Sequence, residues 1–366
     1  MRARRVAVVH DWLTGMRGGE KVLEGILELF PSADLFTLFH RRGSVSPAIE
    51  AHAIHTSYLQ NWADRVGDYR RLLPLFPHAV STWSFNDYDL VVSSSHCVAK
   101  GVRTNRVPHL SYCHTPMRYI WDRFDDYFPH DRPLARAFAR PVASALRRWD
   151  VASSDRVDSF IANSNFVRSR IRTYYGRASE VIHPFVDQQF FEGSMAGERA
   201  DFHVLISALV PYKRVDLAIE AAARSGRSLI VIGDGPERRR LESEASPNVR
   251  FLGFVSTEVI LEHLSRARSL ILPGTEDFGI TPLEAMACGT PVVALRGGGV
   301  VDSVIDGVTG VLFEEPTSHH LCSALDQVES VEWDRGAIRH QASQFGRETF
   351  LQRFGAVADA LTESSR

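Results

Sequence analysis

The stretch that decides the fold is Pro273-Gly-Thr-Glu-Asp-Phe-Gly-Ile-Thr-Pro-Leu-Glu-Ala-Met-Ala-Cys-Gly289. It follows an apolar segment, residues 269–272, that predicts a short buried strand. Thr281 is of the type that caps a helix, so the stretch predicts a strand, a loop and then a helix. Glu276 is expected on the loop, and Glu284, eight residues later, in the first helical turn.

Each of the two acids has a structural and a functional interpretation. Thr281 and Glu284 have the spacing of a capping box, which would satisfy unpaired helix donors without any ligand. Glu276 follows the carboxyl end of a predicted buried strand, where open α/β sheets bind their ligands. An acid in such a loop is nevertheless often only solvated. The residues alone leave both interpretations open.

Apolar segments of strand length alternate with helical segments along the chain. This alternation predicts the α/β class with two doubly wound, Rossmann-like sheets, because parallel strands need crossover helices. A chain of 366 residues is long for one core, so two domains are expected. The predicted strands are residues 6–10, 34–39, 89–93, 109–112, 160–164, 203–209, 228–232, 249–252 and 269–272. The predicted domains are residues 1–187, a linker at 188–201, residues 202–340 and a C-terminal amphipathic helix at 341–366.

Composition excludes several classes of protein. Hydrophobic residues make up 44% of the chain and charged residues 23%, which is typical of a globular protein. The formal net charge is −2, so we expect no nucleic-acid partner. No segment approaches the roughly 20 apolar residues that span a bilayer, and the first residues do not resemble a signal peptide. We therefore expect a protein that is either cytoplasmic or peripheral at the inner membrane.

The cysteines do not have the spacing of a metal site. Each lies in or beside an apolar segment, so we expect small core residues in a reducing compartment and neither a bound metal nor a disulfide. The four cysteines are Cys97, Cys113, Cys288 and Cys322.

A glycine-rich turn follows the first predicted strand. It contains Arg17, Gly18 and Gly19 and leads into a helix, but it lacks the G-x-G-x-x-G dinucleotide fingerprint. The glycines would let backbone amides reach a ligand at a helix N-terminus, where the helix dipole favours phosphate. They are equally consistent with a tight turn that binds nothing.

Two further residues stand at predicted ligand-binding positions. His114 comes shortly after a strand of the first half, although a lone histidine is more often a structural residue. Lys213 begins a helix in the second half. It could hold a pyrophosphate as a point charge, or it could simply be solvated.

Three segments, residues 112–122, 205–217 and 273–300, together resemble glycosyltransferase family 4. The first of them is similar to a motif of bacterial mannosyltransferases of O-antigen and polysaccharide assembly. The resemblance implies a retaining enzyme with two Rossmann-like lobes facing a cleft, the GT-B type. It also implies that the last helix returns to the first lobe.

The resemblance implies roles for particular residues. Glu276 would meet the donor sugar, Glu284 would hold the ribose hydroxyls and His114 would lie against the donor sugar. Lys213 would bind the pyrophosphate, but Ala208 stands where many members have an arginine. We take His114 and Glu276 as the catalytic candidates. The other expected substrate-binding residues are Arg17, Gly18, Gly19, Arg118, Tyr119, Lys213, Arg214, Asp277, Phe278, Gly279, Ile280 and Glu284.

The implied activity is transfer of a sugar, with mannose from GDP-mannose as the expected donor. The expected acceptor is a glycan or a lipid-linked glycan. No metal or other cofactor is expected. Three alternatives stay open: a UDP-sugar-dependent transferase, a nucleotide-sugar epimerase or hydrolase of the same architecture, and a non-catalytic subunit that binds sugar nucleotides.

Aromatic and basic residues interleave between residues 121 and 149. The pattern is consistent with a surface that meets anionic headgroups, but it favours an ordinary helical hairpin packed on the first lobe. The residues concerned are Phe124, Tyr127, Phe128, Arg132, Arg136, Phe138, Arg140, Arg147 and Arg148.

Overall fold

The protein is described from a computed structural model, in which residues 4–127, 133–192 and 199–364 are placed. The chain divides into two compact units, Met1–His183 with Phe350–Arg366, and Pro184–Thr349. The sequence predicts boundaries at residues 187 and 341, whereas the units change at 183 and 349. Within the expected linker, α8 (Gln189–Glu192) groups with the second unit, and residues 193–198 lie outside the described part of the chain.

The first unit is built on a parallel sheet of 7 strands in the order β3-β2-β1-β4-β5-β6-β7. Mainly apolar and small residues form its central strands, because both faces of a parallel sheet are covered. The burial of all five residues of β1 and all six residues of β4 shows this. The strands are β1 (Val6–His10), β2 (Asp34–Thr37), β3 (Ala53–Thr56), β4 (Leu90–Ser95), β5 (His109–Cys113), β6 (Ser159–Ala162) and β7 (Glu180–Val181).

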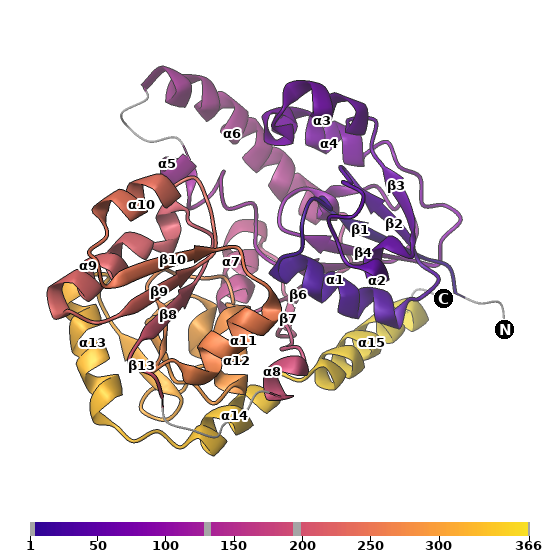
Figure 1. The fold of residues 1–366 in the computed structure, drawn as a ribbon. Helices are drawn as coiled ribbons and strands as arrows, with labels where there is room; N and C mark the ends of the chain where they lie inside the picture. The colour runs from indigo at the N-terminus through magenta and orange to yellow at the C-terminus, as the bar shows by residue number, and fades with distance from the viewer. Residues whose placement is uncertain (1–3, 128–132, 193–198, 365–366) are drawn as a thin grey trace. The chain divides into compact units, whose positions relative to one another are not determined.

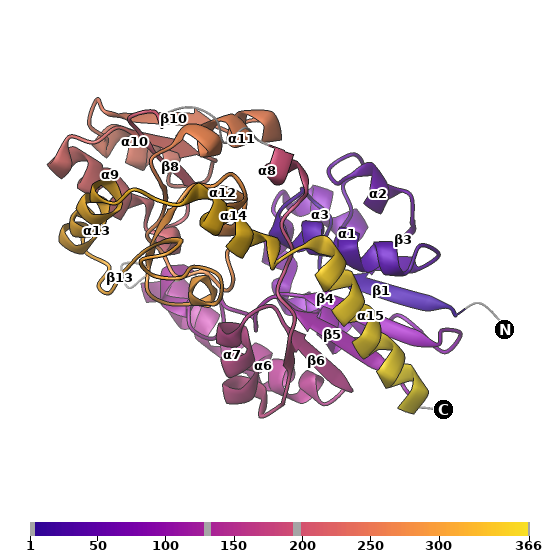
Figure 2. The same ribbon diagram turned by 90° about the horizontal axis from the view of Figure 1, so that it is seen from below.

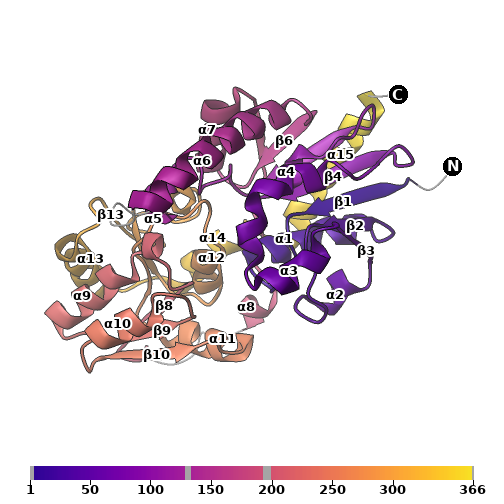
Figure 3. The same cartoon turned by 90° about the horizontal axis from the view of Figure 1, so that it is seen from above.

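Helices cover both faces of this sheet (Figure 1). On one face, Ala7 and Val9 pack in a core with α4 and α6, and α6 lies beside α7 (Figure 3). On the other, Tyr112 contacts Phe350 and Phe354 of α15, with ring centroids 5.9 and 6.2 Å away. The helical segments are α1 (Gly18–Leu29), α2 (Pro47–Glu50), α3 (Gln60–Val66), η1 (Tyr69–Leu75), α4 (Phe76–Val80), η2 (Ala99–Gly101), α5 (Phe124–Tyr127), α6 (Pro133–Ser154), α7 (Asn165–Tyr175) and α15 (Arg347–Ser364).

The second unit has a parallel sheet of 6 strands in the order β10-β9-β8-β11-β12-β13. Alternate residues face opposite cores: Leu270 and Leu272 pack in one cluster, and Ile271 in the other. Helices α9 and α13 cover the cluster that contains Ile271, and α12 packs on α14 (Figures 1 and 2). The strands are β8 (His203–Ile206), β9 (Leu229–Ile232), β10 (Val249–Gly253), β11 (Leu270–Leu272), β12 (Val292–Leu295) and β13 (Gly310–Phe313). The remaining helices are η3 (Pro211–Lys213), α9 (Val215–Ser225), α10 (Arg238–Glu244), α11 (Thr257–Arg266), α12 (Ile280–Ala287), η4 (Gly299–Asp302), α13 (Ser318–Ser330) and α14 (Arg335–Ser343).

The predicted C-terminal helix is two helices, α14 and α15, so the prediction of one continuous helix from residue 341 is wrong. Phe345 lies between them and is buried in the second unit, 6.0 Å from the ring of Phe278. Phe350 and Phe354 instead pack against Tyr112 in the first unit. Phe345, Phe350 and Phe354 have helical spacing, but Phe345 packs in the core of the second unit and the other two pack in the first. This division explains the break between α14 and α15.

The two-lobed Rossmann-like α/β class predicted from the sequence is confirmed by these sheets. Strand β3 was not predicted, because three of its four residues are exposed and its sequence has no apolar run. Helix α6 continues through Pro141, so residues 133–154 form one helix. Of the interleaved residues between 121 and 149, Phe128 and Arg132 lie outside the described residues.

Candidate active site

The second sheet changes direction between β8 and β11. From β8 the chain winds outward through β9 to β10, and it then returns to β11 on the opposite side of β8. Ligands of open α/β sheets bind at the carboxyl ends of the strands at such a point. The loops that follow β8 and β11 at this point, residues 207–214 and 273–279, are therefore the candidate ligand-binding loops.

These two loops are joined by an ion pair between Lys213 and Glu276. Lys213 ends η3 after β8, and Glu276 follows β11. Their side chains are only 15% and 14% exposed, so both charges are largely withdrawn from water. A cation and a carboxylate at one switch point suit a ligand that carries both phosphates and hydroxyl groups.

Glycines allow the neighbouring loops to touch through their backbones. A Cβ atom on Gly274 would lie 2.7 Å from the carbonyl oxygen of Tyr212 and 2.8 Å from that of Lys213. A Cβ atom on Gly298, which has φ +72°, would lie 2.1 Å from the carbonyl oxygen of Glu276. Gly299 donates its N–H to that oxygen at 2.9 Å. The position of Glu276 is thus fixed from both sides.

The structure corrects the predicted start of α12. The helix begins at Ile280 after Gly279, whose φ is +92°, and no side chain caps it. Thr281 is therefore a helical residue, and Glu284 lies in the second turn rather than the first. The capping-box interpretation of Glu284 is therefore wrong, because no side chain caps this helix. The side chain of Glu284 is half-buried.

The residues between Glu276 and Glu284 differ in how far their side chains are exposed. The side chain of Phe278 is 3% exposed and packs in the core against Phe345, so a ligand could meet only its backbone. Asp277 and Ile280 are half-buried. The positive φ of Gly279 turns the chain into the helix.

The turn after β8 holds the predicted phosphate-binding residues. Arg214 precedes α9 with φ +52°, and its guanidinium contacts Asp216 at 3.2 Å. Ala208, where the family offers an arginine, is exposed. Lys213 is therefore the cation of this turn that meets Glu276, while Arg214 is engaged by its own helix.

The first sheet has its switch point between β1 and β4. Asp11 follows β1 and is buried. Its carboxylate accepts the backbone N–H groups of residues 96–99 at 2.7–2.9 Å and ties the loop after β4 to the end of β1. His96 adds a contact at 3.2 Å between Nδ1 and the same carboxylate.

His114 follows β5 and lies beside this switch point. Its Nε2 is 2.8 Å from Oγ of Ser94, and the same hydroxyl oxygen is 3.1 Å from Nδ1 of His10. The ring of His96 is 6.4 Å from that of His114. Burial, then the charges of His10, His96 and Arg118, hold the pKa of His114 well below its usual range, so the ring is neutral.

Helix α1 starts at the predicted glycine-rich turn. Gly18 is its first residue, and the N–H of Arg17 donates to the carboxylate of Glu20 at 3.0 Å. Glu20 is buried, with Oε1 3.6 Å from Nε2 of His10. A Cβ atom on Gly19 would lie 3.8 Å from the ring of His114. The turn and the histidine are thus neighbours in the first unit.

The two candidates for the acceptor side, Arg118 and Tyr119, are half-buried. The hydroxyl of Tyr119 donates a hydrogen bond to the buried thiol of Cys97. Burial raises the pKa of that thiol well above its usual range, so Cys97 is a neutral core residue.

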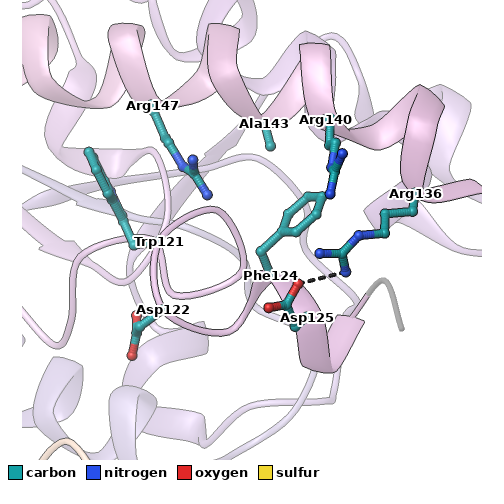
Figure 4. Close-up of a pocket in the computed structure, with 8 residues that line it drawn as sticks. All are labelled: Trp121, Asp122, Phe124, Asp125, Arg136, Arg140, Ala143 and Arg147. Carbon is teal, nitrogen blue, oxygen red and sulfur yellow. Dashed lines mark ion pairs between the residues drawn. The ribbon is translucent and has the colours of Figure 1, made fainter. Parts of the chain in front are cut away.

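A pocket of about 350 Å³ lies between the segment that follows β5 and helix α6 (Figure 4). Arg136 forms an ion pair with Asp125 at 2.6 Å, and Arg147 lies over the ring of Trp121. The side chains that line this pocket combine arginines with aromatic rings, a combination suited to an anionic or sugar ligand. The lining residues are Trp121, Asp122, Phe124, Asp125, Arg136, Arg140, Ala143 and Arg147.

Sequence reasoning placed Ser94 at a strand end, where ligand groups bind, but gave no role to His10 or Glu20. His10 and Ser94 lie within otherwise apolar or small-residue strands, and Glu20 lies in a helix. A signal was present: polar residues at the carboxyl ends of adjacent buried strands meet at one edge of the sheet.

Among the described residues, no group of three or more His, Cys, Asp or Glu side chains could hold a metal ion. The described helices are each too short or too polar to cross a membrane.

Comparison with known families agrees with this division of the chain. Residues 16–190 match the model of Glycosyltransferase Family 4, and residues 187–349 match that of Glycosyl transferases group 1. The first match contains the turn at Gly18 and His114. The second contains Lys213, Glu276 and Glu284.

Related proteins are similar over part of their length. The D-inositol 3-phosphate glycosyltransferase of Geodermatophilus obscurus is 35% identical over 247 residues, which are 58% of this chain and 54% of that protein. That of Kribbella flavida is 31% identical over 264 residues, 61% of each chain. The chain thus spans little more than half the length of these curated relatives.

Solved structures share the fold at low identity. An Anabaena protein, HepE in complex with UDP-glucose, has a TM-score of 0.72 at 20% identity and covers 97% of this chain and 99% of its own. The sucrose-phosphate synthase of Thermosynechococcus elongatus has a TM-score of 0.70 at 18% identity, covering 99% and 100%. The chain thus joins a family 4 domain to a group 1 domain and has the two-lobed GT-B fold of the glycosyltransferases.

Proposed function

We propose that the protein transfers a sugar from a nucleotide-sugar donor to a hydroxyl group of an acceptor. The observation that carries the proposal is the Lys213–Glu276 ion pair at the switch point of the group 1 domain. The ammonium group suits the diphosphate of the donor, and the carboxylate suits the hydroxyl groups of its sugar. Glu284, in α12, is proposed to hold the ribose.

The reaction breaks the bond between the anomeric carbon and the diphosphate oxygen and forms a bond to the acceptor oxygen. The acceptor proton passes to the leaving diphosphate on the same face of the sugar, so configuration is retained. Charge develops on the diphosphate as the bond breaks. Lys213 and the N-terminus of α9 are the groups proposed to stabilise it, without a divalent cation.

The proposed donor is GDP-mannose, on the resemblance of residues 112–122 to mannosyltransferases. UDP-sugars are the second candidate, because solved proteins of this fold contain UDP and UDP-glucose. Both donors would present the same diphosphate to Lys213. The choice between them depends on contacts to the base and the sugar.

The proposed acceptor is a glycan or a lipid-linked glycan. A phosphate-bearing acceptor is the second candidate, because relatives are named D-inositol 3-phosphate glycosyltransferases. The pocket of the first unit favours an anionic group, since Arg136, Arg140 and Arg147 contribute to its lining.

A thermal-shift screen with GDP-mannose, GDP, UDP-glucose and UDP tests the donor. A ligand at 100 times its dissociation constant should stabilise the protein by about 2.7 kcal/mol. Shifts with UDP compounds alone would reject GDP-mannose, and shifts with none of them would reject the proposed function. Donor consumption without any acceptor would indicate a hydrolase or epimerase. Binding without turnover on glycan, lipid-linked or inositol phosphate acceptors would indicate a non-catalytic subunit.

A further inference from the structure

The pocket of the first unit is lined on one side by a single face of helix α6. The residues that α6 contributes recur every three or four positions, the spacing at which helical side chains are neighbours. They are Arg136, Arg140, Ala143 and Arg147. Figure 4 shows the three arginines extending from α6 toward the segment that carries Trp121. The volume of about 350 Å³ is at the lower end of the range for small-molecule sites, so the pocket suits a small ligand.

Both carboxylates that line this pocket already have an arginine partner. Asp125 contacts Arg136 at 2.6 Å. Asp122 forms an ion pair with Arg170, which comes from α7 and not from the lining. The two acids are therefore neutralised by partners of their own and do not offset the other arginines of the pocket.

Arg140 and Arg147 are the arginines that remain. Within the described part of the chain, neither of them forms an ion pair with a carboxylate. Two cations in one pocket repel each other, and an anion that binds between them relieves this repulsion. A guanidinium group also matches the geometry of phosphate, to which it can donate two parallel hydrogen bonds. The pocket therefore favours a phosphate group over a neutral ligand.

Arg147 is held in place by contacts that leave donors for a ligand. Its Nε donates to the carbonyl oxygen of Ile120, and its guanidinium lies over the ring of Trp121, 5.7 Å from the centroid. None of the described residues accepts a hydrogen bond from its two Nη groups. A side chain that is fixed in advance loses less conformational entropy when a ligand binds. Arg147 is thus prepared to donate to a phosphate.

Trp121 is itself fixed from two directions. Its Nε1 donates to Asp150 at 2.8 Å, and its ring stacks on that of Tyr174 with the centroids 4.4 Å apart. Asp150 is fully buried and forms an ion pair with the buried Lys100 at 2.9 Å. The contacts that hold Trp121 therefore also hold the guanidinium that lies over it.

We propose that Arg140 and Arg147 bind a phosphate group carried by a sugar, a polyol or a lipid headgroup, and that Trp121 is a positioning residue for Arg147. That this phosphate belongs to the acceptor of the transfer rests on the proposed function. The binding itself does not, because the residues that carry it all belong to the first unit.

Two experiments on the full chain test the site and separate the sources of phosphate. Isothermal titration with inorganic phosphate, glucose 6-phosphate and glucose tests soluble ligands. Sedimentation with phosphatidylcholine vesicles, with and without phosphatidylglycerol, tests a lipid headgroup. We expect saturable binding of a soluble phosphate or of the phosphatidylglycerol vesicles, and no comparable binding of glucose or of phosphatidylcholine alone. Binding to vesicles only would assign the phosphate to a lipid, and binding in solution only would assign it to a soluble molecule.

Arg140→Gln and Arg147→Gln should each weaken this binding by about tenfold or more, because each removes a charged donor to the phosphate. Trp121→Leu should weaken it by a smaller factor, since Arg147 remains but is no longer held. Arg148→Gln is the matched control and should bind normally. Arg148 is the next residue of α6, is exposed and does not line the pocket.

The proposal would be overturned if none of these phosphates bound, or if Arg140→Gln and Arg147→Gln bound as the unmodified protein does. An equal loss in Arg148→Gln, or a loss confined to Lys213→Ala, would also overturn it, the latter by placing the phosphate in the second unit. If Arg147→Gln does not fold, Arg140→Gln still decides, because Arg140 is exposed.

The outcome for this pocket is distinguishable from the outcome for the proposed function. Phosphate binding that depends on Arg140 and Arg147, in a protein that transfers no sugar, would reject the proposed function and keep the site. Sugar transfer by a protein that binds none of the phosphates would reject the site and keep the proposed function.

Discussion

Lys213 and Glu276 form an ion pair although 63 residues separate them in the sequence. The pair connects the loop after β8 with the loop after β11, on the two sides of the switch point of the second sheet. Each charge offsets part of the cost of withdrawing the other from water, so loss of one partner would leave the other uncompensated. A diphosphate would compete with the carboxylate for the ammonium group, so donor binding and the ion pair are coupled.

Replacement of Lys213 by alanine should lower turnover by a factor of 10²–10³, or about 2.7–4 kcal/mol, because one electrostatic stabiliser of the leaving group is lost. Arg214→Ala is the matched control, since its guanidinium contacts Asp216 rather than Glu276. Steady-state kinetics with saturating donor measure both variants. Near-normal turnover of Lys213→Ala, with loss in Arg214→Ala, would show that the neighbouring residue has the assigned role.

The two acids should respond differently to the same substitution. Glu276→Gln should abolish most turnover while nucleoside diphosphate affinity stays the same or rises, because Lys213 is released from its carboxylate. Glu284→Gln should mainly weaken nucleotide binding. Isothermal titration with GDP and UDP, together with turnover rates, separates these outcomes. Equal loss of nucleotide affinity in both variants would contradict the division of roles between sugar and ribose.

The loop that carries Glu276 depends on a glycine. Gly298 has φ +72° and ψ −153°, a conformation that costs other residues about 1–3 kcal/mol. An added Cβ atom would also lie 2.1 Å from the carbonyl oxygen of Glu276. Gly298→Ala should therefore lower both thermal stability and turnover by displacing Glu276.

Gly297→Ala is the control for this substitution, because its added Cβ atom would have no neighbour closer than 3.8 Å. We expect this variant to keep nearly full activity and stability. If Gly298→Ala had the activity of the unmodified protein, the backbone contact between residues 276 and 298 would not position the acid.

The sequence was sufficient to predict the strands that are buried on both faces. β1 and β11 are continuous apolar runs, and their burial needs no knowledge of distant residues. It was not sufficient for β3, where three of four residues are exposed, nor for the break before α15, where one spacing of phenylalanines serves two cores.

The same division applies to the candidate site. Lys213 and Glu276 could be named individually because each follows a predicted strand, but their ion pair depends on the order of strands in the sheet. The start of α12 was mispredicted because Gly279 turns the chain two residues before Thr281, so no side-chain cap is needed. His10 was passed over because its partner Ser94 comes from another strand.

The last prediction concerns pH and His109. Burial lowers the pKa of this histidine to about 4, from an ordinary value of 6.5, against the raising effects of the Arg156 carbonyl and Asp158. Its Nδ1 donates to that carbonyl at 3.0 Å, and its Nε2 accepts from Ser93 at 2.8 Å, so the folded protein holds the neutral ring.

In the unfolded chain the ring is protonated as the pH falls below 6.5, whereas in the folded protein it stays neutral until about pH 4. The folded state is therefore favoured fully above pH 6.5, and stability is lost as the pH falls toward 4, by up to about 3 kcal/mol. Calorimetric unfolding of the unmodified protein and of His109→Gln between pH 4 and 7 measures the difference. His109→Gln should show a shallower decline, and His319→Gln, at an exposed position, should decline like the unmodified protein. Equal declines in all three proteins would contradict a neutral His109 in the folded state.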